Sequence, residues 1–471
     1  MSATHLTVIG GGPGGYAAAF LAASHGLKVT LIDRMATPGG VCLHRGCIPS
    51  KALLHVAALL GETREAEKMG LLFAEPRVNL DRMRDWKQGV VDKLTGGLAA
   101  QCQRRGVEFI QAEARFVASA RLELTAPDGS VSQRDCEHVI LASGSRPASI
   151  PALSLESPKV WDSTAALELE SVPRRLLVIG GGYIGLELGS VYAALGSKVT
   201  VVEMTDGLLP GADRDLVRVL SKRIKESMHE LRFKTRVAGL KETRAGIEAL
   251  LQAEDGTEEK LVFDRVLVSV GRKPNSQGLG LEHTGVTVNA RGFVEVDTQL
   301  RTADARIFAI GDLVGDPMLA HKAAHEARVA VEVICGGKAR FEPLAIPAVV
   351  FTDPELAWVG LTEDQAASTG QQVTVARFPW GASGRALTLE RTDGLSKLII
   401  DPASERVLGV GLVGVNAGEM IAEATLAIEM GATVRDIAET IHAHPTLSET
   451  TMEAAEVFFG HSAHYYTPRK S

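Results

Sequence analysis

The sequence predicts an α/β fold with two Rossmann-like units followed by a smaller α+β domain. One pattern of strand, glycine loop, helix and strand occurs twice, displaced by 170 residues, as from Gly10 to Gly180. The chain of 471 residues is also too long for one ordinary core, so several domains are expected. Its 48 glycines suit a fold in which the backbone approaches ligands closely.

The first copy of the pattern lies at residues 6–15, LTVIGGGPGG, where a short apolar strand runs into a Gly-x-Gly-x-x-Gly loop. In such a loop, one glycine makes the tight turn, one admits a pyrophosphate and one lets the helix pack on the strand. An alanine-rich helix follows, and the next strand, KVTLID, ends on an acid that can accept hydrogen bonds from ribose. The predicted contacts of this copy are Gly10, Gly12, Pro13, Gly14, Gly15, Asp33 and Arg34.

The second copy reads LLVIGGGYIG at residues 176–185, and its second strand, KVTVVE, ends at Glu203. Because strand, loop, helix and acid recur in the same order, two dinucleotide sites are favoured over two plain turns. The carboxylate of Glu203 would repel a 2′-phosphate, and residues 204–209 contain no Lys or Arg, so the second site favours NAD over NADP. Its predicted contacts are Gly180, Gly182, Tyr183, Ile184, Gly185 and Glu203.

Two of the five cysteines lie close together in the segment GGVCLHRGCIPSK at 39–51. A disulfide between Cys42 and Cys47 would close a very small loop, so it would stabilise little and would suit redox chemistry. Pro49 marks a helix start, which favours a nearby thiolate. Half of a zinc site is the alternative, but no second ligand pair follows at zinc spacing, so no metal is expected. The other cysteines are expected to be buried or inert: Cys102, Cys136 and Cys335.

Composition argues against several classes of partner and location. The formal net charge of −7 gives no reason to expect nucleic acid or an anionic membrane as a partner. No apolar run reaches the roughly 18 residues that a membrane helix needs. The first strand starts near Leu6 without a basic segment before it, which argues against an export signal. A cytoplasmic protein is therefore expected, and in that setting a close cysteine pair is more often catalytic than structural.

The cysteine segment resembles the redox-active segment of the class I pyridine nucleotide–disulfide oxidoreductases. Its Cys-Ile-Pro-Ser-Lys ending is similar to the dihydrolipoamide dehydrogenases rather than to glutathione reductases, which typically have Val-Pro-Lys-Lys there. The resemblance implies that the first glycine loop binds FAD, together with Gly40 and Val41, and that the second binds NAD. It also implies that Cys42 is the interchange thiol that faces substrate and that Cys47 is the charge-transfer thiol against the flavin.

The resemblance places Lys51 near the reactive edge of the flavin, paired with Glu187 of the segment YIGLELG. The alternative for Glu187, which is also assigned to the NAD site, is a charge on the face of the helix that follows the loop. Other matching stretches are ASGSRP at 142–147, VSVGRKPN at 268–275 and RIFAIGDLVGDPMLAHKA at 306–323. Their implied flavin contacts, with Ala114 against the adenine, are Ser143, Gly144, Ser145, Asp312, Met318, Leu319 and Ala320, and Val237 and Gly271 are assigned to NAD. Alternatively, Gly311-Asp312 is an ordinary turn at a strand end.

The C-terminal segment HAHPTLSETTMEAAE at 442–456 resembles the family's catalytic base segment. The resemblance implies that His444 is the base and that Glu449 orients it, since dithiol oxidation needs a base that titrates near neutral pH. Two alternatives stay open from the residues alone: Thr446 and Glu449 also fit a helix capping box, and His442 lies equally close in sequence. The resemblance further implies that this segment completes the partner subunit's site, which makes a homodimer the working unit.

Over the whole chain, the resemblance implies an FAD domain at 1–148 completed by 272–342, an NAD domain at 149–271 and a dimerisation domain at 343–471. The implied reaction is ping-pong oxidation of dihydrolipoyl groups, with electrons passing through the cysteines and FAD to NAD⁺. No lipoyl domain precedes the FAD domain, so the expected partners are the lipoyl domain and acyltransferase core of a 2-oxo acid dehydrogenase-type complex.

The sequence departs from the family's usual residues at three places: Asp33 replaces Glu, Ser143 replaces Thr, and His44-Arg45 replaces Asn-Val. The two charged residues between the cysteines are predicted to increase thiolate character. Other reactions fit less well. Mercuric reductases normally carry a second cysteine pair near the C-terminus, glutathione and trypanothione reductases need arginines for NADP, and a transhydrogenase or NADH oxidase would not need both cysteines and the His-Glu pair. A flavin-binding subunit without turnover is the alternative outside enzymes.

Overall fold

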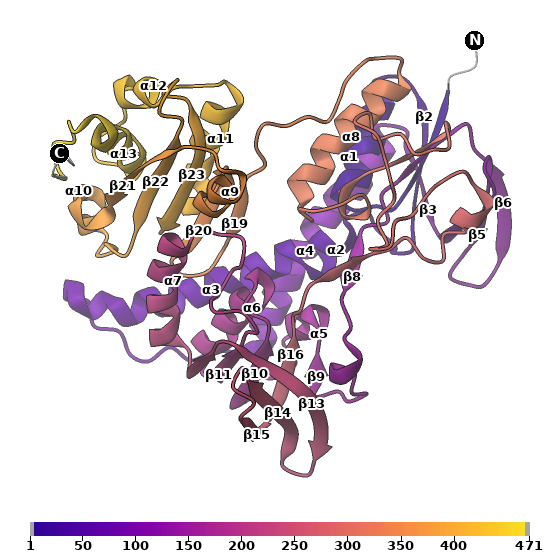
Figure 1. Cartoon of the computed structure of the whole chain (residues 1–471). Helices are drawn as coiled ribbons and strands as arrows, with labels where there is room; N and C mark the ends of the chain where they lie inside the picture. The colour runs from indigo at the N-terminus through magenta and orange to yellow at the C-terminus, as the bar shows by residue number, and fades with distance from the viewer. Residues whose placement is uncertain (1–3, 467–471) are drawn as a thin grey trace.

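The computed structural model describes residues 4–466 and has the predicted α/β architecture. Figure 1 shows two α/β units and a separate C-terminal domain, with the chain crossing from the first unit into the second and returning. The crossing and the return run side by side, because β8 (Ser145–Pro147) pairs antiparallel with β17 (Arg272–Pro274). This two-stranded ribbon joins the units next to the first glycine loop.

The first unit is built on a parallel sheet with the strand order β18-β7-β1-β2-β3. Its strands are almost continuously apolar because helices cover the sheet, as α1 (Pro13–Ser24) and α8 (Ala320–Ile334) do together. The edge strand β18, which follows the second unit in the chain, pairs with β7 and completes this sheet. The strands are β1 (His5–Ile9), β2 (Lys28–Asp33), β3 (Glu108–Gln111), β7 (His138–Leu141) and β18 (Ile307–Ala309).

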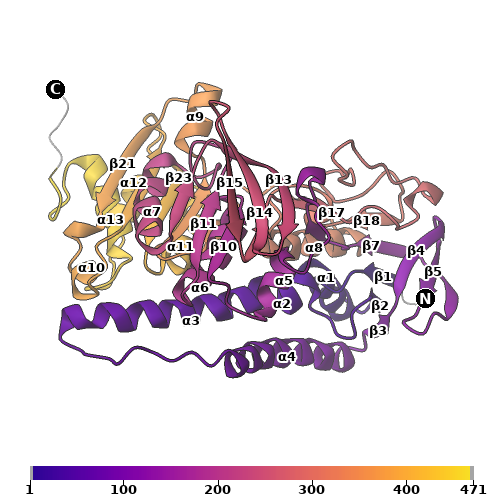
Figure 2. The same cartoon turned by 90° about the horizontal axis from the view of Figure 1, so that it is seen from below.

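Three helices and a small antiparallel sheet complete the first unit. The short α2 (Gly40–Arg45) leads directly into α3 (Cys47–Glu65), and α4 (Leu80–Arg104) packs against α3. Figure 2 shows these two long helices running along one side of the molecule. The antiparallel strands are β4 (Glu113–Ala118), β5 (Arg121–Thr125) and β6 (Val131–Asp135).

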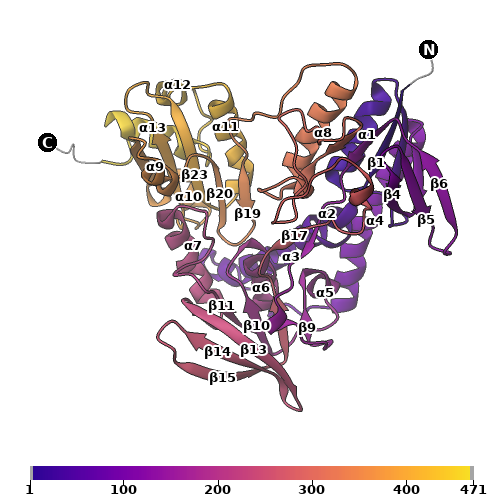
Figure 3. The ribbon, with the colours of Figure 1, turned by 45° about the vertical axis from the view of Figure 1, so that its right-hand side comes forward.

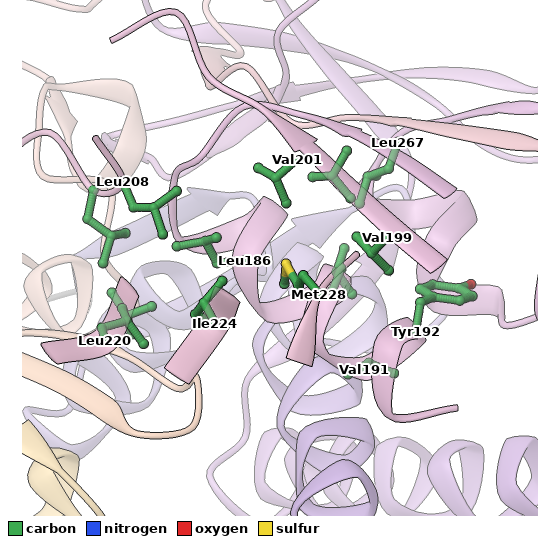
Figure 4. Packing of buried hydrophobic residues seen from close by; sticks show 14 of the residues in the cluster. Leu186, Val191, Tyr192, Val199, Val201, Leu208, Leu220, Ile224, Met228 and Leu267 are labelled. Carbon is green, nitrogen blue, oxygen red and sulfur yellow. The ribbon is translucent and has the colours of Figure 1, made fainter. Parts of the chain in front are cut away.

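The second unit repeats the first with the strand order β12-β11-β10-β16-β9. The inner face of α6 (Tyr183–Ala194) packs on this sheet through Leu186 and Val191, together with α7 (Arg214–Ser227) (Figure 4). The parallel strands are β9 (Val160–Trp161), β10 (Arg175–Ile179), β11 (Lys198–Val202), β12 (Glu230–Arg232) and β16 (Arg265–Val268). The other elements are α5 (Ser163–Glu168) and the antiparallel β13 (Thr235–Thr243), β14 (Gly246–Ala253) and β15 (Glu258–Phe263).

The C-terminal domain is an antiparallel sheet with the order β19-β20-β23-β22-β21, covered on one face by its own helices (Figure 3). Alternate residues of β22 face opposite ways, so Ser396 bonds Thr450 of α13 whereas Lys397 bonds Asp215 of α7. The strands are β19 (Ala348–Val350), β20 (Glu355–Gly360), β21 (Thr374–Pro379), β22 (Leu395–Ile400) and β23 (Val407–Gly414). The helices are α9 (Glu363–Thr369), α10 (Gly384–Thr388), α11 (Ala417–Glu429), α12 (Val434–Glu439) and α13 (Glu449–Phe459).

Within residues 4–466, none of the helices combines the length and the apolar character that crossing a membrane requires.

Candidate active site

A cavity of about 480 Å³ lies where the first glycine loop, the cysteine segment and the second unit meet. It opens at the carboxyl ends of β1 and β2, where open α/β sheets bind their ligands. Many of the residues predicted to contact FAD line it: Gly10, Gly12, Pro13, Gly14, Asp33, Arg34, Gly40, Val41, Lys51, Ala114, Ser143, Gly144, Ser145, Asp312, Met318 and Ala320.

The first glycine loop is shaped so that only glycine fits at its key positions. A Cβ on Gly10 would lie 2.2 Å from the carbonyl oxygen of Ala142, and one on Gly15 would lie 1.7 Å from that of Gly10. A Cβ on Gly40 would lie 2.5 Å from the Cα of Gly12. The N-terminus of α1 has no side-chain cap, so its backbone donors are available at the cavity. This cradle fits a dinucleotide pyrophosphate.

The second glycine loop repeats these contacts. A Cβ on Gly180 would lie 2.5 Å from the carbonyl oxygen of Ser269, and one on Gly185 would lie 2.3 Å from that of Gly180. The N-terminus of α6 also lacks a side-chain cap. The two loops therefore share a backbone geometry and can cradle the same chemical group.

The acids at the strand ends bind their own loops. Asp33 accepts the backbone N–H of Gly11 at 2.5 Å and that of Met35 at 2.8 Å. In the same way, Glu203 accepts the N–H of Gly181 at 2.7 Å and that of Thr205 at 2.8 Å. A carboxylate has about four acceptor positions, so each acid can still accept a ribose hydroxyl.

The remaining predicted residues are placed less directly. Gly15 closes α1 onto the loop, and Leu319 is the N-cap of α8, so neither lines the cavity. Tyr183, Ile184 and Glu187 line the cavity although they were assigned to NAD. Val237 is 9% exposed and packs in the core of the second unit, so a ligand there would meet its backbone rather than its side chain. The other residues predicted to contact NAD lie on the second unit and do not line this cavity: Gly180, Gly182, Gly185, Glu203 and Gly271.

The wall of the cavity around Asp312 is braced by the predicted Ser145 and by three residues that were not predicted, Arg272, Lys322 and Glu326. Ser145 Oγ donates to Asp312 at 2.5 Å, and Arg272 Nε donates to that hydroxyl at 2.7 Å. Behind it, the N–H of Gly311 donates to the buried Glu326, which pairs with Lys322 at 2.8 Å. The i, i+4 spacing of Lys322 and Glu326 was a usable signal, because such pairs share one helix face.

The thiols of Cys42 and Cys47 both line the cavity and are free in the structure. Cys42 lies in α2, and Cys47 begins α3 after the break at Gly46. The hydrogen bond from the Cys42 thiol, opposed by burial and aided by the Lys51 ammonium, lowers the pKa of Cys47 to about 7. The same hydrogen bond, together with burial, raises the pKa of Cys42. Cys47 is therefore the thiol that holds negative charge near neutral pH.

Lys51 is held beside the dithiol by a buried carboxylate. Its ammonium lies 2.8 Å from Glu187, whose side chain is 4% exposed. Glu187 also accepts the Ser50 hydroxyl at 3.2 Å and the backbone N–H of Phe351 at 3.0 Å. The interpretation of Glu187 as a surface charge is therefore wrong. Phe351, which no sequence motif marks, also contacts Lys51, with its ring centroid 4.4 Å from the ammonium.

The charged residues between the cysteines contact another segment. The His44 ring bonds the carbonyl of Thr37 at 3.1 Å, and the Arg45 guanidinium lies 3.7 Å from the sulfur of Met35. The main groups that shift the pKa of Cys47 are Cys42, burial, Lys51 and Glu187. The source of thiolate character at Cys47 therefore differs from the expected one: the Cys42 hydrogen bond is the largest cause and Lys51 adds to it, whereas His44 and Arg45 contact Thr37 and Met35.

The two histidines of the C-terminal segment are in different surroundings. His442 is 5% exposed, and both ring nitrogens are bonded, to the Thr440 carbonyl at 2.8 Å and to Glu423 at 2.7 Å. His444 is 77% exposed, and its Nδ1 lies 2.9 Å from Glu449. Only His444 offers a ring that a substrate thiol can reach.

Glu449 has two roles in this segment. Its second oxygen accepts the backbone N–H of Thr446 at 2.7 Å, which is half of a capping box. The other half does not form, because the Thr446 hydroxyl bonds Ala443 and Ser448 instead and α13 begins at Glu449 itself. The backbone bond fixes the carboxylate that orients His444.

One chain does not bring the base and the dithiol together. His444 and Glu449 belong to the C-terminal domain and are not among the residues that line the cavity with the two cysteines. Figure 1 shows α13 in a different domain from α2. A complete set of groups therefore needs a second chain or a domain movement.

The chain matches two family models: pyridine nucleotide-disulphide oxidoreductase over residues 4–327 and the dimerisation domain of the same family over residues 346–455. Dihydrolipoyl dehydrogenase from Vibrio cholerae is 47% identical over 97% of this chain and 95% of the relative. Dihydrolipoyl dehydrogenase from Haloferax volcanii is 46% identical over 98% of this chain and 97% of the relative.

Solved structures resemble the whole chain. LpdA from Mycobacterium tuberculosis superposes with a TM-score of 0.89 at 29% identity, covering 97% of this chain and 99% of that one. The flavoprotein disulfide reductase RclA from Escherichia coli, in its Cu(II) complex, superposes with a TM-score of 0.86 at 28% identity, covering 97% and 100%. With two glycine cradles, a dithiol at the cavity and a dimerisation domain, the chain belongs to the pyridine nucleotide-disulphide oxidoreductase family.

Proposed function

We propose that the chain is a dihydrolipoyl dehydrogenase, which oxidises dihydrolipoyl groups and reduces NAD⁺. The observation that carries the proposal is the arrangement of Cys42, Cys47 and Lys51 on one cavity, with Cys47 as the thiol of lowered pKa. Relatives of that name match nearly the whole chain at 42–48% identity. A flavoprotein subunit without turnover would not need the thiols to differ in this way.

The proposed chemistry starts at the base. His444, held by Glu449, takes a proton from one dihydrolipoyl thiol, and the resulting thiolate attacks the Cys42 sulfur of the oxidised pair. The Cys42–Cys47 bond breaks, and its electrons remain on Cys47 as a thiolate, which a lowered pKa makes a good leaving group. The second lipoyl thiol then displaces Cys42, so lipoyl disulfide leaves and the enzyme holds a dithiol.

FAD, when bound, would supply the two-electron redox chemistry that links the dithiol to NAD⁺. The residues that would hold it are the cradle of Gly10, Gly12 and Gly40, with Asp33 for ribose and Asp312 for the ribityl or pyrophosphate side. Lys51, fixed by Glu187, stabilises negative charge on the Cys47 thiolate. The second cradle and Glu203 are proposed to hold NAD.

We propose the domain limits 1–148 with 272–342 for FAD, 149–271 for NAD and 343–471 for dimerisation. The entry of β18 into the first sheet supports joining the two FAD segments. The working unit is proposed to be a homodimer in which His444 serves the partner subunit's cysteines. Lipoyl groups then arrive on the lipoyl domain of a cytoplasmic 2-oxo acid dehydrogenase-type complex, whose acyltransferase core is the second partner.

The test is NADH formation from NAD⁺ and dihydrolipoamide by the purified protein carrying FAD. We expect rapid NADH formation with this pair and little reaction when NADP⁺ replaces NAD⁺ or reduced glutathione replaces dihydrolipoamide. Bound flavin without NADH in any combination would overturn the proposal and favour a subunit without turnover. Activity with glutathione and NADP⁺ would instead favour a glutathione reductase.

A further inference from the structure

Arg45 places a buried donor without an acceptor at the dinucleotide cavity. Its side chain lines the cavity beside the first glycine loop, although the sequence predicted no cofactor contact there. Its Nε is buried and has no hydrogen-bond partner among residues 4–466. Its Nη2 contacts the sulfur of Met35 at 3.7 Å, and a thioether is only a weak acceptor. A buried donor without an acceptor costs free energy, so this guanidinium favours a ligand that brings acceptor oxygens.

Three other arginines also have a buried Nε without a partner, and the comparison shows what is particular to Arg45. Each of the three bonds a carboxylate or carbonyl oxygen through another guanidinium nitrogen: Arg175, Arg232 and Arg265. None of the three is among the residues that line the cavity. Arg45 combines the unpartnered donor with a place at the cofactor cavity.

The position of Arg45 on α2 directs its side chain toward the glycine cradle. α2 begins at Gly40, whose backbone meets that of Gly12, and it ends at Arg45, about 7.5 Å further along the helix axis. Side chains on a helix tilt back toward its N-terminus, so Arg45 points toward the Gly40 end. Val41, four residues earlier on the same face of α2, also lines the cavity. The guanidinium is therefore directed at the cradle that fits a pyrophosphate.

Met35 locates the guanidinium beside the acid proposed to bind ribose. The backbone N–H of Met35 donates to Asp33 at 2.8 Å, and both residues line the cavity with Arg45. The guanidinium thus lies between the ribose acid and the glycine cradle. In a dinucleotide, the group between a ribose and the rest of the pyrophosphate is the phosphate that adjoins that ribose.

The chemistry of Arg45 suits this phosphate, and its charge has no other assignment. A guanidinium is a planar cation with five N–H donors, and its hydrogen bonds to phosphate are among the strong ones in proteins. The leading causes of the Cys47 pKa shift do not include Arg45. Two other cations at the cavity already bond the chain, since Lys51 pairs with Glu187 and Arg272 donates to Ser145.

We propose that Arg45 binds the phosphate of FAD that adjoins the adenosine ribose. The contact adds to the family's usual site, in which Val stands at this position. The inference rests on the proposed placement of FAD in this cavity. Arg45 takes no part in electron transfer, and its effect is on how tightly and in what position the cofactor is held.

The first test measures how tightly the purified holoenzyme and its variants hold FAD, from the fluorescence of flavin released on dilution. We expect Arg45→Met, which keeps a long apolar chain without the charge, to raise the Kd for FAD by roughly tenfold or more. Arg45→Lys keeps the charge but not the fork, so its Kd should lie between those of the wild type and Arg45→Met. The control is Arg64→Met, an exposed arginine of α3 that donates to the Ala194 carbonyl at 3.2 Å, and its Kd should be unchanged.

Phosphorus NMR of the FAD-loaded protein then locates the contact. The two phosphates of FAD give separate resonances. We expect Arg45→Met to move the resonance of the phosphate next to adenosine more than that of the other phosphate. The Arg64→Met control should leave both resonances where they are in the wild type.

The outcomes separate this inference from the proposed function. An unchanged Kd in Arg45→Met overturns the inference, and so does a higher Kd with unmoved phosphorus resonances, because the contact then lies elsewhere on FAD. Equal weakening by Arg45→Met and Arg45→Lys also overturns it, since the charge then has no role. Neither measurement needs turnover, so a wild type that holds FAD but forms no NADH overturns the proposed function while the same two measurements still decide the inference. A wild type that binds no FAD overturns both.

Discussion

At the scale of single residues, the Cys42–Cys47 hydrogen bond decides which thiol is charged, and Lys51 adds to the lowering of the Cys47 pKa. Glu187 and Phe351 contact the Lys51 ammonium. We expect Lys51→Met to raise the pKa of Cys47 by about one unit, because the loss of a nearby positive charge destabilises the thiolate. Lys51→Arg keeps the charge and should change the pKa little.

The measurement for Lys51 is the pH dependence of iodoacetamide alkylation of the reduced enzyme, with mass spectrometry separating the Cys42 and Cys47 peptides. In the wild type, the Cys47 midpoint should lie at about 7. A midpoint that stays there in Lys51→Met would show that the Cys42 hydrogen bond alone sets the pKa.

His442 gives a pH-dependent contribution to stability. The hydrogen bond that His442 donates to Glu423, partly opposed by burial, raises the pKa of His442 above its usual value of about 6.5. A raised pKa in the folded state stabilises the protein below the unfolded value, and this stabilisation is lost as the pH rises through the folded value. Glu423→Gln should therefore lower the melting temperature by roughly 2 °C at pH 5.5 and by less at pH 8.5.

The control for Glu423 is Glu439→Gln, whose side chain is 72% exposed. Its effect on melting should be small at both pH values. Equal destabilisation of Glu423→Gln at pH 5.5 and pH 8.5 would contradict a role for the charged form of His442.

His442 and His444 show which assignments of single residues could be made from the sequence and which could not. Residue type and spacing indicated a base at His444 or His442 but could not separate them, because the difference is burial and a distant partner. His442 is enclosed by Glu423 of α11, and His444 is not. The same reason applies to Glu187, whose contact with Phe351 joins residues 164 positions apart.

At the scale of elements, the two glycine cradles can be told apart by matched substitutions. Gly15→Ala should force the first loop open, because its Cβ would lie 1.7 Å from the Gly10 carbonyl, so the protein should purify with little flavin. The Gly185→Ala protein should keep its flavin, but its KM for NAD⁺ should rise at least tenfold, because a Cβ at this position would lie 2.3 Å from the Gly180 carbonyl oxygen.

Flavin absorbance per subunit and KM for NAD⁺ measure these two effects. The control is Gly61→Ala, an open position in α3 where alanine favours the helix. Loss of flavin from Gly185→Ala with retention in Gly15→Ala would reverse the assignment of the two dinucleotides.

The repeated elements were predictable because their signals are local. Each glycine loop, its strand and its acid lie within about thirty residues, which is the span of one βαβ unit. The antiparallel strands β13–β15 and the C-terminal sheet carry no such motif, and the order β19-β20-β23-β22-β21 depends on packing between distant segments. The 170-residue repeat extends beyond the glycine motif. The backbone N–H of Met35 donates to Asp33, and the backbone N–H of Thr205, at the equivalent position, donates to Glu203.

At the scale of the whole molecule, a buried charge cluster joins the second unit to the C-terminal domain. Lys397 is fully buried, and its ammonium lies 2.7 Å from Asp213 and 2.9 Å from Asp215. Glu363 of α9 also contacts it. The three carboxylates resemble a metal site by number, but the Lys397 ammonium contacts all three and the Arg377 guanidinium contacts Asp215 and Glu363.

Lys397→Met should destabilise the protein by about 3 kcal/mol, because it leaves the buried Asp213 carboxylate without its cation, whereas Asp215 and Glu363 keep Arg377. Chemical denaturation measures the change, and adding Asp213→Asn to the variant should restore part of it. Lys260→Met is the control, since Lys260 is 65% exposed and lies 3.5 Å from Glu248, so its removal should change stability by less than about 0.5 kcal/mol. Similar effects of the two lysine substitutions would contradict the role of the cluster.

The largest-scale prediction concerns the two parts of the site that one chain keeps apart. If His444 serves the partner subunit's cysteines, a chain carrying Cys42→Ser and a chain carrying His444→Gln complement each other. A mixed dimer then contains one site with both wild-type groups and one site with neither. Random pairing makes about half of the dimers mixed, so co-expression should recover about a quarter of wild-type activity, although each variant alone is nearly inactive. The measurement is NADH formation by the unselected co-expressed dimers; dimers selected for a different affinity tag on each chain are all mixed and should show about half of wild-type activity. If the site formed within one chain, every site would carry one defect and no activity would return.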